Sequence, residues 1–177
     1  MLAKKIAVII ASKDFRDEEY FVPKNLWEAS AAVVKTISDK EGIALGADGA
    51  EAVVDMALDN LNPAEFDAIV FIGGPGALRC LDNDRSYRVI KDTVTSNKVL
   101  GAICVSPVIL AKAGALAGKR ATVWTSLLDK SAARILKEHQ ADYREQAVVT
   151  DGKIVTANGP SASEEFARKI KELLITP

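Results

Sequence analysis

The fold is decided by the stretch KVLGAICVSPVILAKA, residues 98–113, in which an apolar run is followed at once by a helical pattern. The run 98–103 predicts a buried strand, and residues 107–113 predict the start of a helix. Cys104 stands in the short joint between them, where a serine would form a nucleophile elbow. A thiol at this turn faces the positive end of the helix, which favours the nucleophilic thiolate. The alternative is a small buried hydrophobic residue, since free cysteine is often buried.

Three further apolar runs have the character of buried strands: Ile6–Ile10, Ala68–Ile72 and the shorter Ala147–Val149. Runs without alternation are typical of a parallel sheet that is covered on both faces. Because helical patterns separate the runs, we predict an α/β three-layer sandwich with helices on both faces. Its sheet is doubly wound, mostly parallel and flavodoxin-like, and it carries a cysteine at a nucleophile elbow.

The expected helices share an apolar spacing of three to four residues. They cover Pro23–Val34, Asp84–Ser96, Ser131–His139 and Ser161–Ile175, with a short helix at Ala64–Phe66. In the last long helix, Ser161 and Glu164 have the spacing of a capping box. The glycine-containing segment Gly42–Met56 is typical of small hairpin strands.

Composition limits the classes of function. The chain has 177 residues, 49% hydrophobic and 27% charged, which is enough for one compact domain over residues 1–177. The net charge of −1 gives no electrostatic indication of binding to nucleic acid or to an anionic membrane. The apolar runs are far shorter than the roughly 20 residues of a membrane span. Ile6–Ile10 is too short for a signal-peptide core, so we expect a cytoplasmic protein.

Cysteine and histidine are too few for a structural framework. Two cysteines do not make a disulfide scaffold in a chain of this length. One histidine and two cysteines argue against a structural zinc site. We therefore expect no metal and no cofactor.

Three loops are expected to meet, because the carboxyl ends of parallel strands share one edge of a sheet. These loops are Ala11–Tyr20, Gly73–Gly76 and Cys104–Ser106. The second loop reads GGPG, and its backbone N–H groups can be directed at a developing oxyanion. The alternative is a tight turn without a ligand. Its spacing matches neither a P-loop nor a dinucleotide fingerprint.

The first loop contains the acidic stretch DFRDEEY, residues 14–20. A carboxylate from this loop can reach Cys104. If it is buried and protonated, it donates a hydrogen bond to the thiolate; if it is ionised, it repels the thiolate and raises the cysteine pKa. For Asp14, Asp17 and Glu18 the better interpretation is a solvated acidic turn.

With these motifs in order, the chain resembles the PfpI-like superfamily. This is a class I glutamine amidotransferase-like fold that includes intracellular proteases and the parkinsonism-associated deglycase. The resemblance covers nearly the whole chain. It rests on IAVII (6–10), FRDEE (15–19) with Pro23, NPAEFDAIVFIGG (62–74), GAIC (101–104) with Pro107, and LAGKRAT (116–122).

The resemblance implies roles for individual residues. Cys104 corresponds to the family nucleophile, and Glu19 to the glutamate that hydrogen-bonds it. Gly73 and Gly74, with the backbone of Val105, correspond to the oxyanion side of the pocket. The resemblance also implies a homodimer or a higher homo-oligomer.

The chain departs from the family pattern in several places. Protease-type members carry histidine directly after the cysteine, where this chain has Val105, and glycine one position later, where it has Ser106. The acidic residue after the Gly-Gly loop has its nearest match around Ala77. Residues 122–126, TVWTS, lack the histidine of deglycase- and glyoxalase-type members. The single histidine, His139, lies in a polar stretch and is expected to be exposed.

These departures shape the expected function. Peptide hydrolysis needs an acid to protonate the amine leaving group, so a cysteine protease or amidase is disfavoured. Chemistry on small carbonyl compounds or their protein adducts needs fewer proton-transfer groups, because Cys104 can add to an aldehyde while Glu19 shuttles the proton. The expected enzyme is a glyoxalase- or deglycase-like hydrolase or lyase. Tyr20, Ser106 and Trp124 then line the pocket, with ordinary core positions as the alternative for the two aromatic residues.

Two non-enzymatic interpretations remain open. In a redox sensor, Cys104 is oxidised to a sulfenic or sulfinic acid, and Cys80 is a resolving thiol if the fold brings it near. In a chaperone-like stress protein, Cys104 is an unreactive remnant of the family nucleophile. The expected partners are a small carbonyl substrate or a modified protein, without nucleic acid or membrane.

Overall fold

Seven strands form the central sheet of the computed structural model, which describes residues 3–175. Every pair of neighbours is parallel except the last two strands at one edge. The strands are β1 (Lys5–Ile10), β3 (Val33–Ser38), β6 (Met56–Ala57), β7 (Ala68–Phe71), β8 (Val99–Ile103), β11 (Val148–Asp151) and β12 (Ile154–Ala157).

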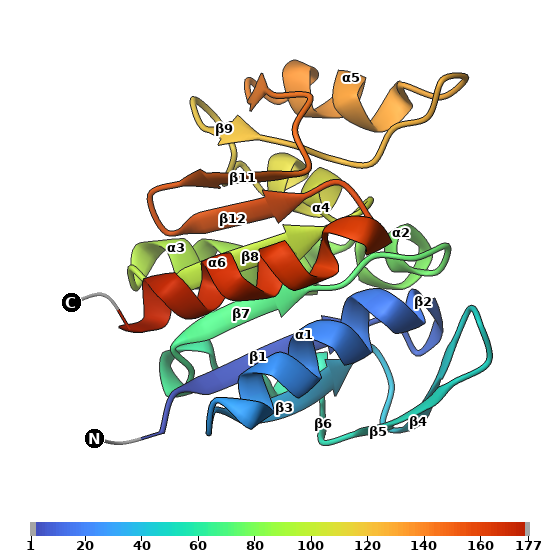
Figure 1. The fold of residues 1–177 in the computed structure, drawn as a ribbon, viewed down its shortest axis with the longest axis vertical. Coiled ribbons are helices and arrows are strands. Elements are labelled where there is room, and N and C mark those ends of the chain that lie inside the picture. The colour runs from blue at the N-terminus through green and yellow to red at the C-terminus, as the bar shows by residue number, and fades with distance from the viewer. Residues whose placement is uncertain (1–2, 176–177) are drawn as a thin grey trace.

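The strand order is β11-β12-β8-β7-β1-β3-β6 (Figure 1). Counted along the chain, the five longer parallel strands follow the 2-1-3-4-5 order of flavodoxin-like folds. The winding direction reverses between β1 and β7, so the loops that follow these two strands diverge at the carboxyl edge. Ligands of such sheets bind at this point. The predicted fold class is confirmed.

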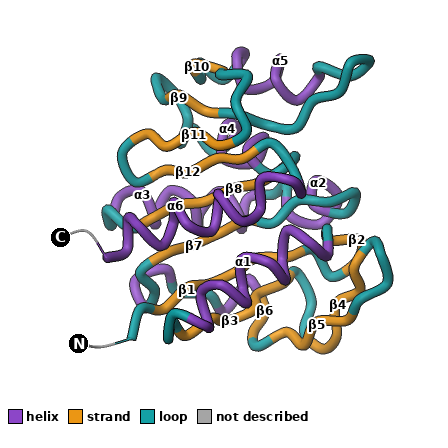
Figure 2. The backbone as a smooth tube through the Cα atoms, in the orientation of Figure 1, coloured by secondary structure: helices purple, strands orange, loops and turns teal. Residues whose placement is uncertain are grey.

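Helices cover both faces of the sheet (Figures 1 and 2). On one face α1 (Asp17–Ala29) packs against α6 (Ser163–Ile175), and the Trp27 indole N–H donates to the Ala167 carbonyl at 3.0 Å. None of the helices in residues 3–175 is long and apolar enough to cross a membrane. The helices that pack on the other core layer are α2 (Ala77–Leu81), α3 (Asp84–Thr95), α4 (Pro107–Lys112) and α5 (Ser131–Glu138).

Two small sheets flank the central one. The first has the order β2-β4-β5 and contains the expected hairpin of segment 42–56. The second pairs β9 with β10 and extends the molecule toward α5. Their strands are β2 (Lys13–Phe15), β4 (Gly42–Gly46), β5 (Glu51–Val54), β9 (Arg120–Ala121) and β10 (Asp142–Tyr143).

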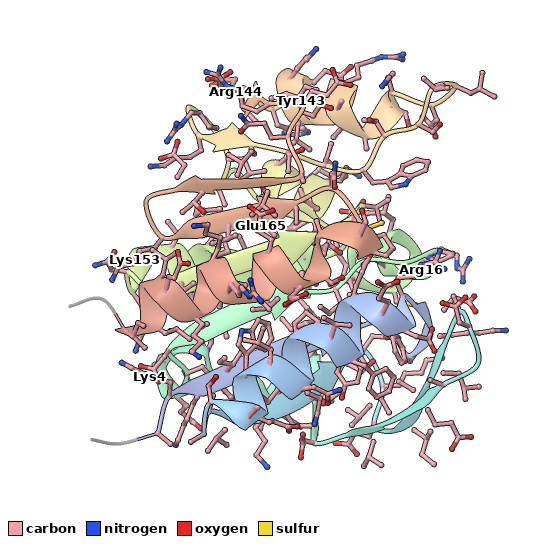
Figure 3. The ribbon with its side chains drawn as sticks, viewed as in Figure 1. Lys4, Arg16, Tyr143, Arg144, Lys153 and Glu165 are labelled. Carbon is pink, nitrogen blue, oxygen red and sulfur yellow. The ribbon has the colours of Figure 1, made fainter. Side chains whose placement is uncertain are left out.

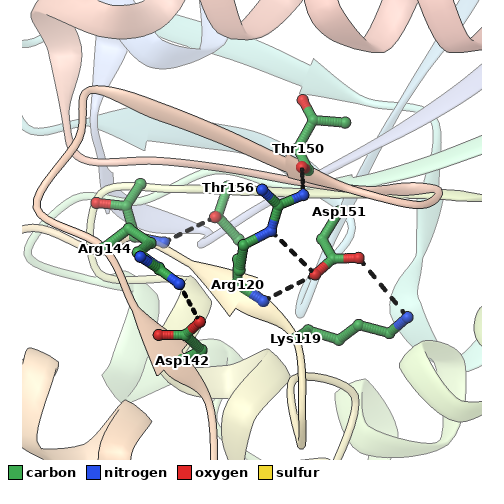
Figure 4. A network of polar contacts seen from close by, with 8 residues as sticks. Lys119, Arg120, Asp142, Arg144, Thr150, Asp151 and Thr156 are labelled. Atoms are coloured by element: carbon green, nitrogen blue, oxygen red, sulfur yellow. Dashed lines mark hydrogen bonds and ion pairs between the residues drawn. The ribbon is translucent and has the colours of Figure 1, made fainter.

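Polar contacts join the β9–β10 sheet to the edge of the central sheet (Figure 4). The Arg120 N–H donates to the Asp151 carboxylate at 2.9 Å, and the buried Thr122 N–H donates to Thr156 Oγ1 at 2.9 Å. Lys119 adds an ion pair with Asp151 at 3.8 Å. Because the ion pair is exposed to solvent, the buried hydrogen bond stabilises this junction more.

The helix predicted over Pro23–Val34 has the wrong bounds. The chain leaves the helix after Ala29, and Ala31 adopts a left-handed conformation with φ 62°. Residues from Val33 onward form β3, which pairs in parallel with β1. The helical spacing of the apolar residues thus continued across a turn into a strand.

Three smaller predictions are corrected. The strand expected at Ala147–Val149 is β11, an antiparallel edge strand, and its neighbour β12 was not predicted. Ser161 lies exposed in a 3₁₀ turn over Pro160–Ala162, and α6 begins at Ser163, so Ser161 is not its cap. The expected short helix is a 3₁₀ turn over Pro63–Glu65, and another such turn covers Leu58–Asn60.

Candidate functional site

The loops after β1, β7 and β8 meet at the carboxyl edge, as predicted. The Arg16 N–H donates to the Gly73 carbonyl at 3.0 Å, which joins the first loop to the second. The Gly76 N–H donates to the Asp14 carbonyl at 3.0 Å and strengthens the same junction. Backbone hydrogen bonds therefore fix the relative positions of the loops that surround Cys104.

Cys104 occupies a sharp elbow between β8 and α4. Its φ of 63° lies in the left-handed region, which is uncommon for residues other than glycine. Its N–H donates to the Ala157 carbonyl at 2.9 Å, and its carbonyl accepts from the Trp124 N–H at 2.8 Å. The residue is 7% exposed. The neighbouring strand and loop therefore hold a strained backbone conformation that keeps the thiol at the sheet edge.

Glu19 approaches the thiol from the first turn of α1. The residue is fully buried, and its Oε2 accepts from the Gly73 N–H at 3.0 Å. The Cys104 thiol interacts with the same carboxyl group. The other oxygen, Oε1, is buried and has no standard hydrogen-bond partner among the residues that the structure describes. One half of the carboxyl group is thus anchored to the backbone, and the other half is available to hold a proton.

Burial shifts the titration of both groups. It raises the pKa of Glu19 from 4.5 to about 7, against the opposing effects of Cys104, the Gly73 N–H and the Arg16 charge. Burial, followed by the charge and hydrogen bond of an ionised Glu19, raises the pKa of Cys104 to about 12. The pair therefore gives up its first proton near neutral pH and its second only in strongly basic solution. Between these limits the pair holds one proton, mainly on the Cys104 sulfur, and one negative charge, mainly on Glu19.

The glycine loop must be free of side chains to fit between these groups. A Cβ on Gly73 would lie 2.4 Å from Cys104 Cβ and 2.8 Å from Glu19 Oε2. The backbone N–H groups of Gly74 and Val105 face the sulfur and lower the pKa of Cys104. The Gly73 N–H, expected on the oxyanion side, is engaged by Glu19. The donors near the sulfur are therefore those of Gly74 and Val105.

Two of the residues expected in the pocket form hydrogen bonds elsewhere. The Tyr20 hydroxyl hydrogen-bonds Thr36 Oγ1 at 2.6 Å within the core, so the phenol group points toward β3. The Ser106 hydroxyl is buried and donates to the Ile72 carbonyl at 2.7 Å. Ser106 thus joins the end of β7 to the elbow, and Tyr20 is a core residue, which is the alternative interpretation of its sequence position.

The remaining candidates lie in different surroundings. Trp124 is half-buried beside the elbow, and a Cβ on Gly159 would lie 3.7 Å from its indole Cδ1. Cys80 is half-buried on α2 and packs on the core layer opposite to the one that contains Cys104. The structure therefore does not bring the two thiols together. His139 is exposed at the end of α5, as predicted.

Sequence reasoning missed Asp17, whose interpretation as a solvated residue is wrong. Asp17 is buried, and its carboxylate accepts from the Asp48 N–H at 2.9 Å and the Ala50 N–H at 2.8 Å. A Cβ on Gly46 would lie 2.3 Å from this carboxylate. Glycine at position 46 opposite an acidic first helical turn was the available signal. Of the other two acids, Glu18 is exposed, as expected.

Arg16 was also missed as a member of the site. Its backbone bonds the glycine loop, and its charge lowers the pKa of Glu19. Its buried Nε has no hydrogen-bond partner in the described part of the chain. Within residues 3–175 no group of three or more histidine, cysteine, aspartate or glutamate side chains is placed to hold a metal ion.

Known proteins resemble this chain in sequence and in fold. The sequence model of the DJ-1/PfpI family matches residues 4–173. An uncharacterized protein from Methanocaldococcus jannaschii is 37% identical over 94% of this chain and 80% of its own length. Protein/nucleic acid deglycase 2 from Escherichia coli is 30% identical over 98% and 99% of the two chains. A crystal structure of a ThiJ/PfpI domain protein from Brachyspira murdochii has a TM-score of 0.91 at 30% identity, covering 98% of each chain. The chain therefore belongs to the DJ-1/PfpI family.

Proposed function

We propose that this protein is a cofactor-free cysteine–glutamate enzyme that acts on small carbonyl compounds or on their protein adducts. Cys104 is the nucleophile, and Glu19 is the acid and base. The observation that carries the proposal is the half-anchored Glu19 carboxyl, fully buried beside the thiol with a pKa of about 7. A general acid–base group works best when its pKa lies near the working pH. The deglycase name of the Escherichia coli relative supports the same class of substrate.

The first step is addition of the Cys104 thiolate to an aldehyde carbon. Glu19 takes the thiol proton as the carbon–sulfur bond forms, and the carbonyl electron pair moves to oxygen, which takes this proton from Glu19 to give a hemithioacetal. The N–H groups of Gly74 and Val105 are the nearest backbone donors for the developing negative charge.

With a 2-oxoaldehyde, Glu19 then moves a proton from the adduct carbon to the neighbouring carbon, and the hydroxyl proton of the adduct carbon passes to the neighbouring oxygen. The aldehyde carbon is oxidised to a thioester as the ketone carbon is reduced to an alcohol, so no external oxidant is needed. Water cleaves the thioester to a 2-hydroxy acid and restores Cys104. With a protein adduct of the same aldehyde, Cys104 displaces the amine from the hemiaminal carbon, the amine leaves with a proton from Glu19, and the resulting hemithioacetal follows the same path.

Peptide hydrolysis fits the site less well. Val105 occupies the position at which the family's proteases carry histidine and has no group that could protonate an amine. His139 is exposed on α5 and does not belong to the site. Glu19 alone would have to supply every proton, and its Oε2 is already engaged with Gly73.

The test is consumption of methylglyoxal with detection of the 2-hydroxy acid product. We expect turnover by the wild type and by Cys80→Ser, and none by Cys104→Ser. Turnover that survives Cys104→Ser would overturn the proposal. Absence of turnover in the wild type, with two oxygens added to Cys104 by mild peroxide, would instead favour the redox sensor.

We also propose that the protein acts as a homodimer or a higher homo-oligomer. The β4–β5 hairpin presents an apolar pair to solvent, because Ile43 is 59% and Val53 is 75% exposed and the two residues are cross-strand partners. Leu45 extends this patch on the same strand. Light scattering should give a multiple of the 18.9 kDa chain mass. A monomer for the double variant Ile43→Lys, Val53→Lys would assign the interface to the hairpin, and a monomeric wild type would exclude it.

A further inference from the structure

Arg16 has unused hydrogen-bonding capacity at the rim of the Cys104 site. Within residues 3–175 its guanidinium bonds only to Asp48, with Nη1 at 3.5 Å from both carboxylate oxygens. Nε is buried without a partner. The side chain is 32% exposed, and Figure 3 shows it at the edge of the molecule where α2 and β2 lie. Arginine has five N–H donors, so this long contact leaves most of them free of protein partners.

The glycine loop lies between the Arg16 backbone and the reactive sulfur. The Gly74 N–H faces the Cys104 sulfur, and a Cβ on the same glycine would lie only 2.4 Å from the Arg16 backbone nitrogen. Gly74 thus lies between the Arg16 backbone and the thiol. Its positive charge also acts on Glu19, whose pKa it lowers.

The other charges of this rim are already engaged. Asp14 pairs with Arg79 at 2.6 Å, and both oxygens of Asp17 accept backbone N–H groups of the hairpin. Glu18 points into solvent. Among these charged side chains Arg16 therefore keeps spare donors for an anion, and Asp48 is the competitor for them.

We propose that Arg16 is a specificity-determining residue that binds a carboxylate on the substrate. The site then prefers carbonyl compounds that carry a carboxylate close to the reacting carbon, and glyoxylate is the smallest aldehyde of this kind that can add to the sulfur. A guanidinium matches a carboxylate with two parallel N–H donors, so it also orients the carbonyl carbon toward the sulfur. This inference rests on Cys104 being the reactive group of the proposed function.

The test compares alkylation of Cys104 by iodoacetate, an anion, and by iodoacetamide, its neutral counterpart of the same size. In both reactions the sulfur displaces iodide and forms a carbon–sulfur bond. The ratio of the two rates cancels the thiolate fraction, so it is independent of any change in the pKa of Cys104. Peptide mass spectrometry separates Cys104 from Cys80.

We expect Arg16→Gln to lower the iodoacetate-to-iodoacetamide ratio about tenfold, the size of a lost charge-assisted hydrogen bond. Arg16→Lys should retain part of the ratio, and Asp48→Asn should raise it by removing the competitor. Salt should lower the ratio in the wild type more than in Arg16→Gln. The matched control is Arg144→Gln, which removes the same charge at the distant β10 end of the molecule (Figure 3) and should leave the ratio unchanged.

The outcomes separate this inference from the proposed function. A normal iodoacetamide rate with the same ratio in the wild type and in Arg16→Gln overturns the role of Arg16 alone. Cys104 that reacts with neither reagent overturns both proposals. With the enzyme active, glyoxylate should inhibit methylglyoxal turnover, because its adduct with Cys104 has no ketone carbon to be reduced, and Arg16→Gln should raise the inhibition constant for glyoxylate about tenfold.

Discussion

Two regions receive a carboxylate from the same turn of α1, and they use it differently. Asp17 reaches the turn of the β4–β5 hairpin, where two backbone N–H groups satisfy both of its oxygens. Glu19 reaches the elbow, where one oxygen has a backbone donor and the other has no standard partner. A buried carboxylate with all its hydrogen bonds supports the fold, whereas a half-satisfied one can exchange a proton with its neighbour. Hydrogen bonding, rather than burial alone, therefore separates the structural acid from the reactive one.

The sharpest test of this contrast is a pair of isosteric substitutions. Glu19→Gln removes the exchangeable proton and should lower methylglyoxal turnover by about 10²- to 10³-fold, the usual contribution of a general acid–base group. Asp17→Asn should leave turnover close to the wild type, since its carboxylate contacts only the hairpin turn. Steady-state rates of the two variants decide the matter, and equal losses would mean that the two acids do not differ in role.

The second expected effect is a pH dependence of stability that belongs to Glu19. Between pH 4.5 and about 7 the folded protein keeps a proton on Glu19 that the unfolded chain has lost. The free energy of unfolding therefore falls as the pH rises through this window, by about 3 kcal/mol in total. Glu19→Gln lacks this loss. Urea denaturation of both proteins at several pH values measures the difference, and parallel pH profiles would contradict the buried, protonated carboxyl.

The third effect concerns the hairpin. Asp17→Asn replaces one accepting oxygen by an amide N–H₂ that faces a backbone donor. We expect it to lower the free energy of unfolding by about 1–3 kcal/mol, the cost of a buried unsatisfied donor. Amide hydrogen exchange should quicken in residues 46–50. Unchanged exchange in this turn would mean that Asp17 does not anchor it.

The smallest effect is expected at Ser106, a third buried polar group at the same edge. Its hydroxyl donates to the Ile72 carbonyl. Ser106→Ala should cost about 1 kcal/mol of stability through this lost bond and should leave alkylation of Cys104 unchanged. A large fall in the alkylation rate would show that the hydroxyl takes part in the chemistry rather than only in the fold.

Much of the fold could be predicted from the sequence, because the patterns that determine it lie in short, continuous stretches of the chain. The apolar run before Cys104 and the glycines after β7 were enough to predict an elbow and a meeting of loops, and the family motifs pointed to Glu19. The strand β3 was missed because Val34 continued the helical spacing of α1, and only the left-handed Ala31 ends that helix.

The partners of charged side chains were harder to predict. Asp17 and Arg16 stand in an acidic, hydrophilic stretch, and their burial depends on the hairpin turn some 30 residues away. A pattern of residues that are adjacent in the sequence does not predict such a long-range contact. The same holds for the Gly73 N–H, whose engagement by Glu19 depends on the first turn of α1 lying against the loop after β7.

The proposed chemistry depends on a proton shared by Glu19 and Cys104, and the pH dependence of iodoacetamide alkylation of Cys104 measures that sharing. We predict a rate midpoint near 7 in the wild type, below the free-thiol value of about 8.5, because the first proton leaves the pair near neutral pH. In Glu19→Gln the midpoint should rise above about 8.5, since burial then acts on an isolated thiol. A wild-type midpoint at or above the free-thiol value, or one unmoved by the substitution, would show that the two groups do not share a proton.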